Sequence, residues 1–256
     1  MATMVFNRVE KKYKLNEEKY QAFWSDLIKY MEIDEFGRHT ISNIYYDTPD
    51  DLLIRRSIEK PVYKEKLRLR SYGRPTLNDN VFLEIKKKYD GIVNKRRIAL
   101  PLQNAYDYMN KNISPFPPTQ ILSELDYFKS LYHLSPKLLL SYERIALYGK
   151  EDPTFRVTFD TGIRSRTDNL RLEKGSYGNF LFKDACIYLM EVKITNSTPL
   201  WFSKLLSKHQ IYPTSFSKYG NVYKEQMLAN NSQKTITGVA NADKAMQSIE
   251  DHLVAV

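Results

Sequence analysis

The segment VYKEKLRLRS, Val62–Ser71, places four cations on one side of an extended chain. Side chains alternate between the two faces of a β-strand, so one face is cationic and the other carries leucines. The cations are Lys64, Lys66, Arg68 and Arg70. Adjacent like charges repel one another, and convergent ammonium and guanidinium groups bind phosphate oxygens well. The segment therefore indicates chemistry on a compact, phosphate-rich anion.

The same one-sided distribution of charge recurs in the other segments that alternate like strands. Their polar faces hold fourteen lysines or arginines and four acids, whereas a solvated sheet face would carry a more even mixture. The cations are Arg8, Lys12, Lys14, Lys64, Lys66, Arg68, Arg70, Lys86, Lys88, Lys95, Arg97, Arg144, Arg156 and Lys193. The acids are Glu10, Glu84, Asp160 and Glu191. A half-solvated open sheet is the alternative explanation.

The acids among these cations can act in two ways. A carboxylate surrounded by cations is a natural ligand for Mg²⁺ or Mn²⁺ that bridges phosphate oxygens. It can equally form an internal salt bridge with a neighbouring lysine or arginine, and we favour this second role for Asp160. The candidate metal ligands are then Glu191, Glu84 and Glu10.

Helices must cover the apolar face of these strands. After Asn16, a candidate helix cap, apolar residues recur at helical spacing through Met31. Such a helix needs an apolar sheet face to pack against. We therefore predict an α+β fold, in which an antiparallel closed β-barrel turns its apolar face outward and is flanked by helices. Its charged interior forms a tunnel, and about eight strands leave room inside for a small ligand.

The expected elements succeed one another along the whole chain. Strands are expected at Phe6–Leu15, His39–Asp47, Val62–Ser71, Val81–Tyr89, Ile92–Leu100, Lys137–Leu147, Phe155–Asp160 and Ile187–Ile194. Helices are expected from Asn16 to Met31, from Thr48 to Glu59, within Leu102–Tyr132 with a break at SPFPPT, and at Leu200–Gln210 and Ser217–Ala229. Asp90-Gly91 predicts a hairpin turn. Residues 1–229 are expected to form a single domain, followed by a polar tail at 230–256 with an optional short helix.

Composition narrows the class of protein. The 256 residues carry a net charge of +9 and one cysteine, Cys186, which excludes a disulfide framework and a Cys-based zinc site. We find no secretory leader and no apolar run long enough to span a bilayer, which predicts a soluble, cytoplasmic protein. Nucleic acid is not an expected partner, because its binding sites spread cations along an open surface with aromatic faces for stacking.

Nine motifs occur in the order seen in VTC-domain polyphosphate polymerases, the catalytic domains of vacuolar transporter chaperone complexes and their bacterial relatives. They are RVEKKY, YYDTP, KLRLRSYG, FLEIKKK, NKRRIAL, SYERIALYG, FRVTFDTGIRSR, LMEVKI and FSKYGNVY. The chain resembles this family, part of the triphosphate tunnel metalloenzyme (CYTH-like) superfamily, from about Val5 to Met227. The resemblance implies transfer of the γ-phosphoryl group of ATP to a growing polyphosphate chain, with Mn²⁺ or Mg²⁺. A membrane-protein partner, and with it a peripheral place at the membrane, stays open.

The resemblance also implies roles for individual residues. The expected catalytic, phosphate-binding residues are Lys12, Arg68, Arg70, Lys86, Lys95, Arg156 and Arg166. The expected further substrate contacts are Lys66, Tyr142, Arg144, Arg164, Lys193, Ser217 and Lys218. Arg164 competes with Arg166 for one role, and Glu191 resembles the metal ligand of the family.

One motif departs from the hydrolytic members of the superfamily, which resemble one another in a first-strand Glu-x-Glu-x-Lys. Arg8 occupies the first Glu position, which leaves Glu10 before Lys12. The loss of one carboxylate favours phosphoryl transfer over hydrolysis. A triphosphate hydrolase of the same fold and a non-catalytic module that binds polyphosphate or inositol phosphate are the alternatives, with RNA 5′-triphosphate processing a less favoured variant.

Overall fold

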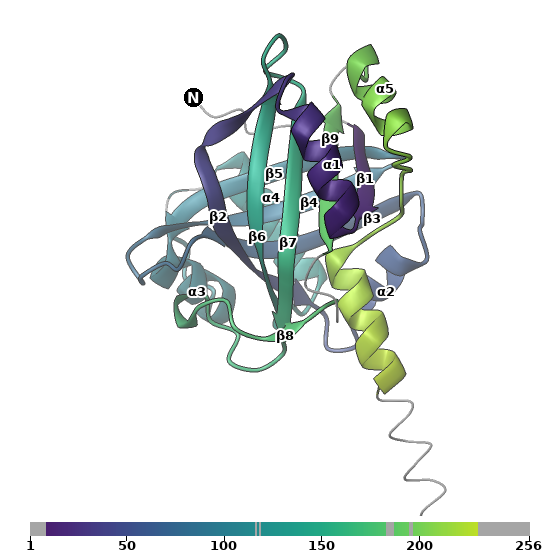
Figure 1. Cartoon of the computed structure of the whole chain (residues 1–256). Helices are drawn as coiled ribbons and strands as arrows, with labels where there is room; N and C mark the ends of the chain where they lie inside the picture. Colours follow the sequence, from purple (N-terminus) through teal and green to yellow (C-terminus); the bar gives the residue numbers. More distant parts are fainter. Residues whose placement is uncertain (1–8, 116, 118, 183–186, 195–196, 230–256) are drawn as a thin grey trace, which may run out of the picture.

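The computed structural model describes residues 9–115, 117, 119–182, 187–194 and 197–229 (Figure 1), so the expected tail at 230–256 lies outside them. Nine strands in this part of the chain form one antiparallel sheet. In sheet order they are β1 (Val9–Leu15), β9 (Tyr188–Ile194), β7 (Arg156–Arg166), β6 (Ser135–Gly149), β2 (Met31–Asp47), β3 (Tyr63–Tyr72), β4 (Asn80–Tyr89) and β5 (Ile92–Pro101). The short β8 (Asn179–Phe180) pairs with β7.

Four helices occupy connections between strands, and two more follow β9 in the described part of the chain. They are α1 (Glu17–Leu27), α2 (Leu52–Ile58), α3 (Leu102–Lys111), α4 (Gln120–Leu131) and α5 (Leu200–Lys208). Residues 218–229 form a further helix, and Leu172–Lys174 form one 3₁₀ turn. The large antiparallel sheet with its helices confirms the predicted α+β class.

Local signals in the sequence start and stop several of these elements as expected. The Asn16 side chain accepts a hydrogen bond from the Lys19 backbone N–H at 3.0 Å and so caps α1. Asp90 and Gly91 both have positive φ, 41° and 83°, as a two-residue hairpin between β4 and β5 requires. The prediction that α1 reaches Met31 is wrong, because Met31 instead pairs with Gly149 at the start of β2.

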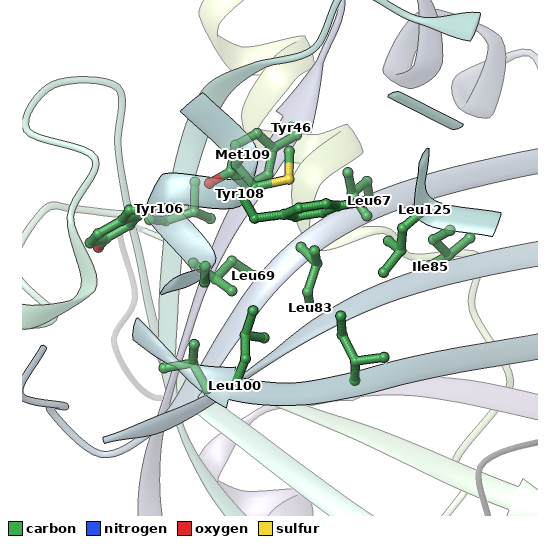
Figure 2. Close-up of a cluster of buried hydrophobic side chains, with 14 of the residues drawn as sticks. Tyr46, Leu67, Leu69, Leu83, Ile85, Leu100, Tyr106, Tyr108, Met109 and Leu125 are labelled. Carbon is green, nitrogen blue, oxygen red and sulfur yellow. The ribbon is translucent and has the colours of Figure 1, made fainter. Parts of the chain in front are cut away.

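The convex face of the sheet is apolar and lies under helices, as predicted. Figure 2 shows one of its clusters, in which Leu67 and Leu83 of neighbouring strands meet Tyr108 of α3 and Leu125 of α4. A second cluster lies under α1 and α5, where the Phe23 ring is 6.0 Å from the Phe202 ring. Burial of these side chains positions the sheet. The other face carries the polar groups together with a third cluster, in which Ile41 and Leu140 meet Tyr219.

The predicted closure of the barrel is wrong. β1 and β5 are the two edges of the sheet, and within the described residues no hydrogen-bonded ladder joins them, although the two strands contact each other. The Lys12 carbonyl oxygen of β1 instead accepts a hydrogen bond from the Thr214 backbone N–H at 2.7 Å. Closure depends on the number and stagger of all the strands together, and alternation within single strands carries no information about it.

A β-bulge in β7 reverses which of its side chains face the concave side. Arg144 of β6 pairs with Asp160, but Ser141 pairs with Arg164, so an extra residue is accommodated around Gly162. Gly162 has φ +57°, in the left-handed region. Asp160 therefore faces the concave side, whereas Arg164, beyond the bulge, shares the convex side with Ser141.

We expect Gly162→Ala to lower the free energy of unfolding by about 1–2 kcal/mol, because a Cβ is disfavoured in the left-handed region. No neighbouring atom lies within 4 Å of that Cβ, so backbone strain alone is tested. Gly162→Asn is the matched control, since Asn tolerates this conformation better and should lose less. Urea denaturation measures both variants, and equal losses would contradict the strain argument.

Candidate functional site

A cavity of about 510 Å³ lies on the concave face of the sheet. Fourteen lysines or arginines line it, against two acids, Glu10 and Glu191. Enclosed charge of one sign focuses the electrostatic potential and attracts oppositely charged ligands. The four cations of β3, Lys64, Lys66, Arg68 and Arg70, are all in this lining. The cavity is thus suited to a polyanion.

Most of the residues predicted for the site are brought together here. The predicted residues that line the cavity are Lys12, Lys66, Arg68, Arg70, Lys86, Lys95, Tyr142, Arg144, Lys193, Ser217, Lys218, Glu10 and Glu191. They come from six strands and from the segment that follows α5. A strand places every second residue on one face, and each of the six strands contributes one to three of them.

Three predicted arginines, Arg156, Arg164 and Arg166, are not in the lining of this cavity. Beyond the bulge, the Arg166 guanidinium donates hydrogen bonds to four carbonyl oxygens of the 169–177 loop. The Arg164 guanidinium lies over the Phe180 ring at 4.1 Å. Arg156 is on the concave face opposite Lys193, with its guanidinium 3.4 Å from Asp34. A phosphate-binding role for these three stays a prediction.

Glu84 is fully buried and organises the cations around it. Its carboxylate accepts hydrogen bonds from Arg68 Nε at 2.8 Å and from Lys95 Nζ at 2.9 Å, and Arg70 Nε lies 3.7 Å away. Burial opposes ionisation, but Arg70 and Arg68 hold the pKa of Glu84 well below its ordinary value. Glu84 therefore acts as an enclosed counter-ion that orients two arginines.

Asp160 forms the internal salt bridge expected for it. Its carboxylate accepts two hydrogen bonds from Arg144, at 2.6 and 2.7 Å, and one from Lys218 Nζ. Burial raises its pKa, but Arg144 and Lys218 outweigh burial and lower the pKa of Asp160 to about 2. The carboxylate ties the last helical segment to the sheet.

Glu191 differs from these two acids because it lines the cavity and, among the described residues, has only longer ion pairs. Lys12 Nζ is 3.9 Å and the Arg144 guanidinium 3.8 Å from its carboxylate oxygens, beyond hydrogen-bonding distance. Burial raises its pKa, yet Lys12 and Lys86 hold it well below the ordinary value. Glu10, by contrast, accepts a hydrogen bond from Lys86 Nζ at 2.6 Å. Glu191 is therefore an ionised carboxylate open to a cation in the cavity.

Two of the cavity lysines, Lys66 and Lys95, have pKa values well below the ordinary value of a lysine. Burial, followed by the neighbouring Lys12 and Lys86, lowers the pKa of Lys66 to about 7. Burial is also the main cause that lowers the pKa of Lys95 to about 8. A bound polyanion would reverse these shifts, so binding should draw protons onto the lysines.

Sequence reasoning missed several residues of the site. Residues 213–216 cross from α5 into the cavity, where the Phe216 carbonyl oxygen accepts a hydrogen bond from Lys12 Nζ at 3.0 Å. Asn43 and Tyr45 of β2 accept hydrogen bonds from Arg70 and Arg68, at 2.9 and 3.3 Å. Asn43 and Tyr45 alternate with Ile44, a pattern from which their shared strand face could have been predicted. No local sequence pattern predicts that residues 213–216 enter the cavity.

The fold and the site define an α+β domain whose curved antiparallel sheet encloses a cationic cavity. The chain belongs to the VTC domain family, which it matches over residues 7–226. It is similar to vacuolar transporter chaperone complex subunit 4 of Trypanosoma brucei brucei, with 30% identity over 153 residues that cover 48% of this chain and 19% of that protein. With subunit 4 of Trypanosoma cruzi the identity is 26% over 220 residues, 71% of this chain and 27% of that protein. The chain thus spans less than a third of these relatives.

Solved structures share the fold at low sequence identity. A Bacillus halodurans protein named as an adenylate cyclase superposes with a TM-score of 0.56 and 16% identity, over 84% of this chain and 96% of that chain. An adenylyl cyclase of Hippeastrum with a dominant triphosphatase activity gives 0.50 and 14%, over 83% and 93%. None of the helices in the described ranges is long and apolar enough to cross a membrane.

We expect Glu84→Gln to lower the free energy of unfolding by about 3–5 kcal/mol, because it leaves Arg68, Arg70 and Lys95 without their buried counter-ion. Glu124→Gln is the control, since Glu124 also pairs with two cations but is partly exposed on the convex side, and it should lose less than about 1 kcal/mol. Urea denaturation followed by circular dichroism measures both. Similar losses in the two variants would show that burial of Glu84 does not increase its contribution to the free energy of unfolding.

The low pKa of Lys66 predicts a pH-dependent stability. In the unfolded chain Lys66 binds a proton up to about pH 10.5, but in the folded protein only up to about pH 7. This difference lowers the free energy of unfolding by its full amount below pH 7. The loss then shrinks as the pH rises from 7 to 10.5. We expect Lys66→Met to stabilise the protein by roughly 2 kcal/mol at pH 7 and by much less near pH 10. Exposed Lys204→Met is the control; a gain independent of pH would contradict the assignment.

Proposed function

We propose that the protein is a metal-dependent polyphosphate polymerase, which transfers the γ-phosphoryl group of ATP to a growing polyphosphate chain. The observation that carries the proposal is the set of cavity cations that Glu84 holds in place. In phosphoryl transfer the protein forms few covalent bonds itself. Catalysis depends mainly on cationic groups held in fixed positions around the phosphates. Membership of the VTC domain family supports the same activity.

The reaction exchanges one P–O bond for another. A terminal phosphate oxygen of the polyphosphate chain attacks the γ-phosphorus of ATP in line. The bond from that phosphorus to the β–γ bridging oxygen breaks, and ADP leaves with the electron pair. Arg68, Arg70 and Lys86 hold the phosphate oxygens and offset their charge, and no side chain has to act as a nucleophile.

The cavity suits a divalent cation held mainly by phosphate oxygens and water. Mg²⁺ in such sites typically binds one or two protein carboxylates and keeps several waters. Glu191 is the carboxylate available for this, since Glu84 is enclosed and Glu10 is engaged by Lys86. The described residues contain no group of three or more His, Cys, Asp or Glu positioned for a metal. When bound, Mn²⁺ or Mg²⁺ would offset phosphate charge next to Glu191.

The partners and the location belong to the same proposal. ATP and polyphosphate are the proposed substrates, and the cytoplasm is the proposed site of action. The curated relatives are subunits of a vacuolar transporter chaperone complex. This supports a membrane-protein partner that receives the product, with the protein bound peripherally.

A triphosphate hydrolase of the same fold is the second candidate function. The likeness to the Hippeastrum protein with dominant triphosphatase activity favours it. The two functions differ in the acceptor, which is a phosphate chain in one case and water in the other. A non-catalytic binding module would hold the same ligands without turnover.

We expect incubation with ATP and Mn²⁺ or Mg²⁺ to produce ADP and long polyphosphate chains, seen on a gel with orthophosphate release measured in parallel. Orthophosphate without chains would favour the hydrolase, and the absence of turnover would favour the binding module. Glu191→Gln should fold normally and lose at least tenfold in metal-dependent transfer, because the amide lacks the charge that holds the metal. It should bind tripolyphosphate without metal at least as tightly as the unaltered protein does.

Glu143→Gln is the matched control for this variant. Glu143 lies on β6 outside the cavity lining and accepts a hydrogen bond from Thr40 Oγ1 at 2.6 Å. Its substitution should leave transfer unchanged. Full metal-dependent activity in Glu191→Gln would remove Glu191 from the metal site.

A further inference from the structure

The two ends of the concave face differ in chemistry. At one end, the cavity is lined by Lys60, Lys64, Lys88 and Lys224. At the other end, beyond Arg70, the side chains on this face are aromatic. Tyr72 lies two residues after Arg70 on β3 and so shares its face, and Phe82 of β4 pairs directly with Arg70.

Four rings at this end form a continuous aromatic row, Phe36, His39, Tyr72 and Phe82. Ring centroids are 6.2 Å apart for Phe36 and His39, 5.8 Å for His39 and Tyr72, and 5.6 Å for Tyr72 and Phe82. The Arg97 guanidinium lies over the Phe82 ring at 4.5 Å. The row therefore extends from β2 across β3 to β4 and ends in a cation.

The row is partly exposed to solvent, and its neighbouring rings meet edge to face or tilted, at interplanar angles of 76°, 53° and 82°. Phe36 is 67% exposed and Tyr72 47% exposed, whereas the rings of α1 and α5 pack into buried clusters. Exposed aromatic side chains that form a group mark binding surfaces more often than scattered ones do. The neighbouring Arg70 is one of the proposed triphosphate ligands, so the surface adjoins the anion site.

We infer that the aromatic row is the platform on which the base of the donor nucleoside triphosphate stacks; this inference rests on the proposed function. Base–aromatic stacking tolerates any base, and an adjacent arginine adds a cation–π contribution. The separation also fits. Two strand residues span about 7 Å, from Arg70 at the phosphates to Tyr72 at the base, a length that a ribose can bridge.

The platform has consequences for specificity. Stacking strength depends on ring area, so purine nucleotides should bind more tightly than pyrimidine nucleotides. Tripolyphosphate, which has no base, should gain nothing from the row. ATP and GTP should differ little, because ring faces contact both purines alike.

The test compares the binding of ATP and of tripolyphosphate by isothermal titration calorimetry in the absence of turnover. We expect Tyr72→Ala to weaken ATP binding about tenfold or more and to change tripolyphosphate binding less than twofold. Tyr63→Ala is the matched control, since Tyr63 lies at the other end of the same strand and is 46% exposed. It should change neither affinity. Tyr72→Phe keeps the ring and should retain ATP affinity, which separates stacking from loss of the hydroxyl.

Unchanged ATP affinity in Tyr72→Ala, or an equal fall for both ligands, would overturn the platform. Tyr63 lies on the face of β3 opposite Lys64, so a larger ATP loss in Tyr63→Ala would show that the effect does not come from the aromatic row and would also overturn the platform. The difference between the two ligands is a binding measurement, so it stands if the proposed polymerase activity fails. A protein that makes polyphosphate yet shows no base effect would refute the platform alone.

Discussion

Repulsion among like charges is the constraint on which this structure depends. Fourteen cationic side chains line one cavity, and folding must bring them together without a ligand. Two buried carboxylates offset part of this repulsion. Glu84 of β4 lies between β3 and β5, and Asp160 of β7 pairs with Lys218 of the 218–229 helix. Each is held ionised by the cations around it, so the acid and the cations stabilise one another. The apolar convex clusters then supply the burial that holds the curved sheet in place.

The same constraint separates the acids by function. Glu84 and Asp160 are enclosed by donors within hydrogen-bonding distance. Their carboxylates accept hydrogen bonds from Arg68 and Arg144 and so orient these arginines. Glu191 stays open to the cavity, because the nearest cations among the described residues lie 3.8 and 3.9 Å from its carboxylate. A carboxylate in that state favours a divalent cation that would otherwise be repelled by the lysines. Positioned cations and one open carboxylate are the parts that phosphoryl transfer requires.

The segment that follows α5 packs beside the edge strand β1. β1 and β5 do not pair, and residues 213–216 run past β1 into the cavity, where Thr214 and Phe216 bond to Lys12. Ser217 accepts a hydrogen bond from Lys66 Nζ at 3.2 Å, and Lys218 reaches Asp160. Two lysines of the cavity are therefore held by neutral oxygens of this segment, whose bonds a phosphate can replace.

The amino-acid sequence by itself determined which side chains share a face. Lys64, Lys66, Arg68 and Arg70 alternate with leucines, and this period of two is a property of any extended chain. The cap at Asn16 and the hairpin at Asp90-Gly91 were likewise readable, because each is decided by a few adjacent residues. Only the tertiary structure decided that Arg164 and Arg166 leave the cavity, since the bulge at Gly162 appears when β7 pairs with β6. It also decided that Glu84 is enclosed while Glu191 is open, and that β1 and β5 stay unpaired. These outcomes depend on register and distance between segments far apart in the chain, which local periodicity does not encode.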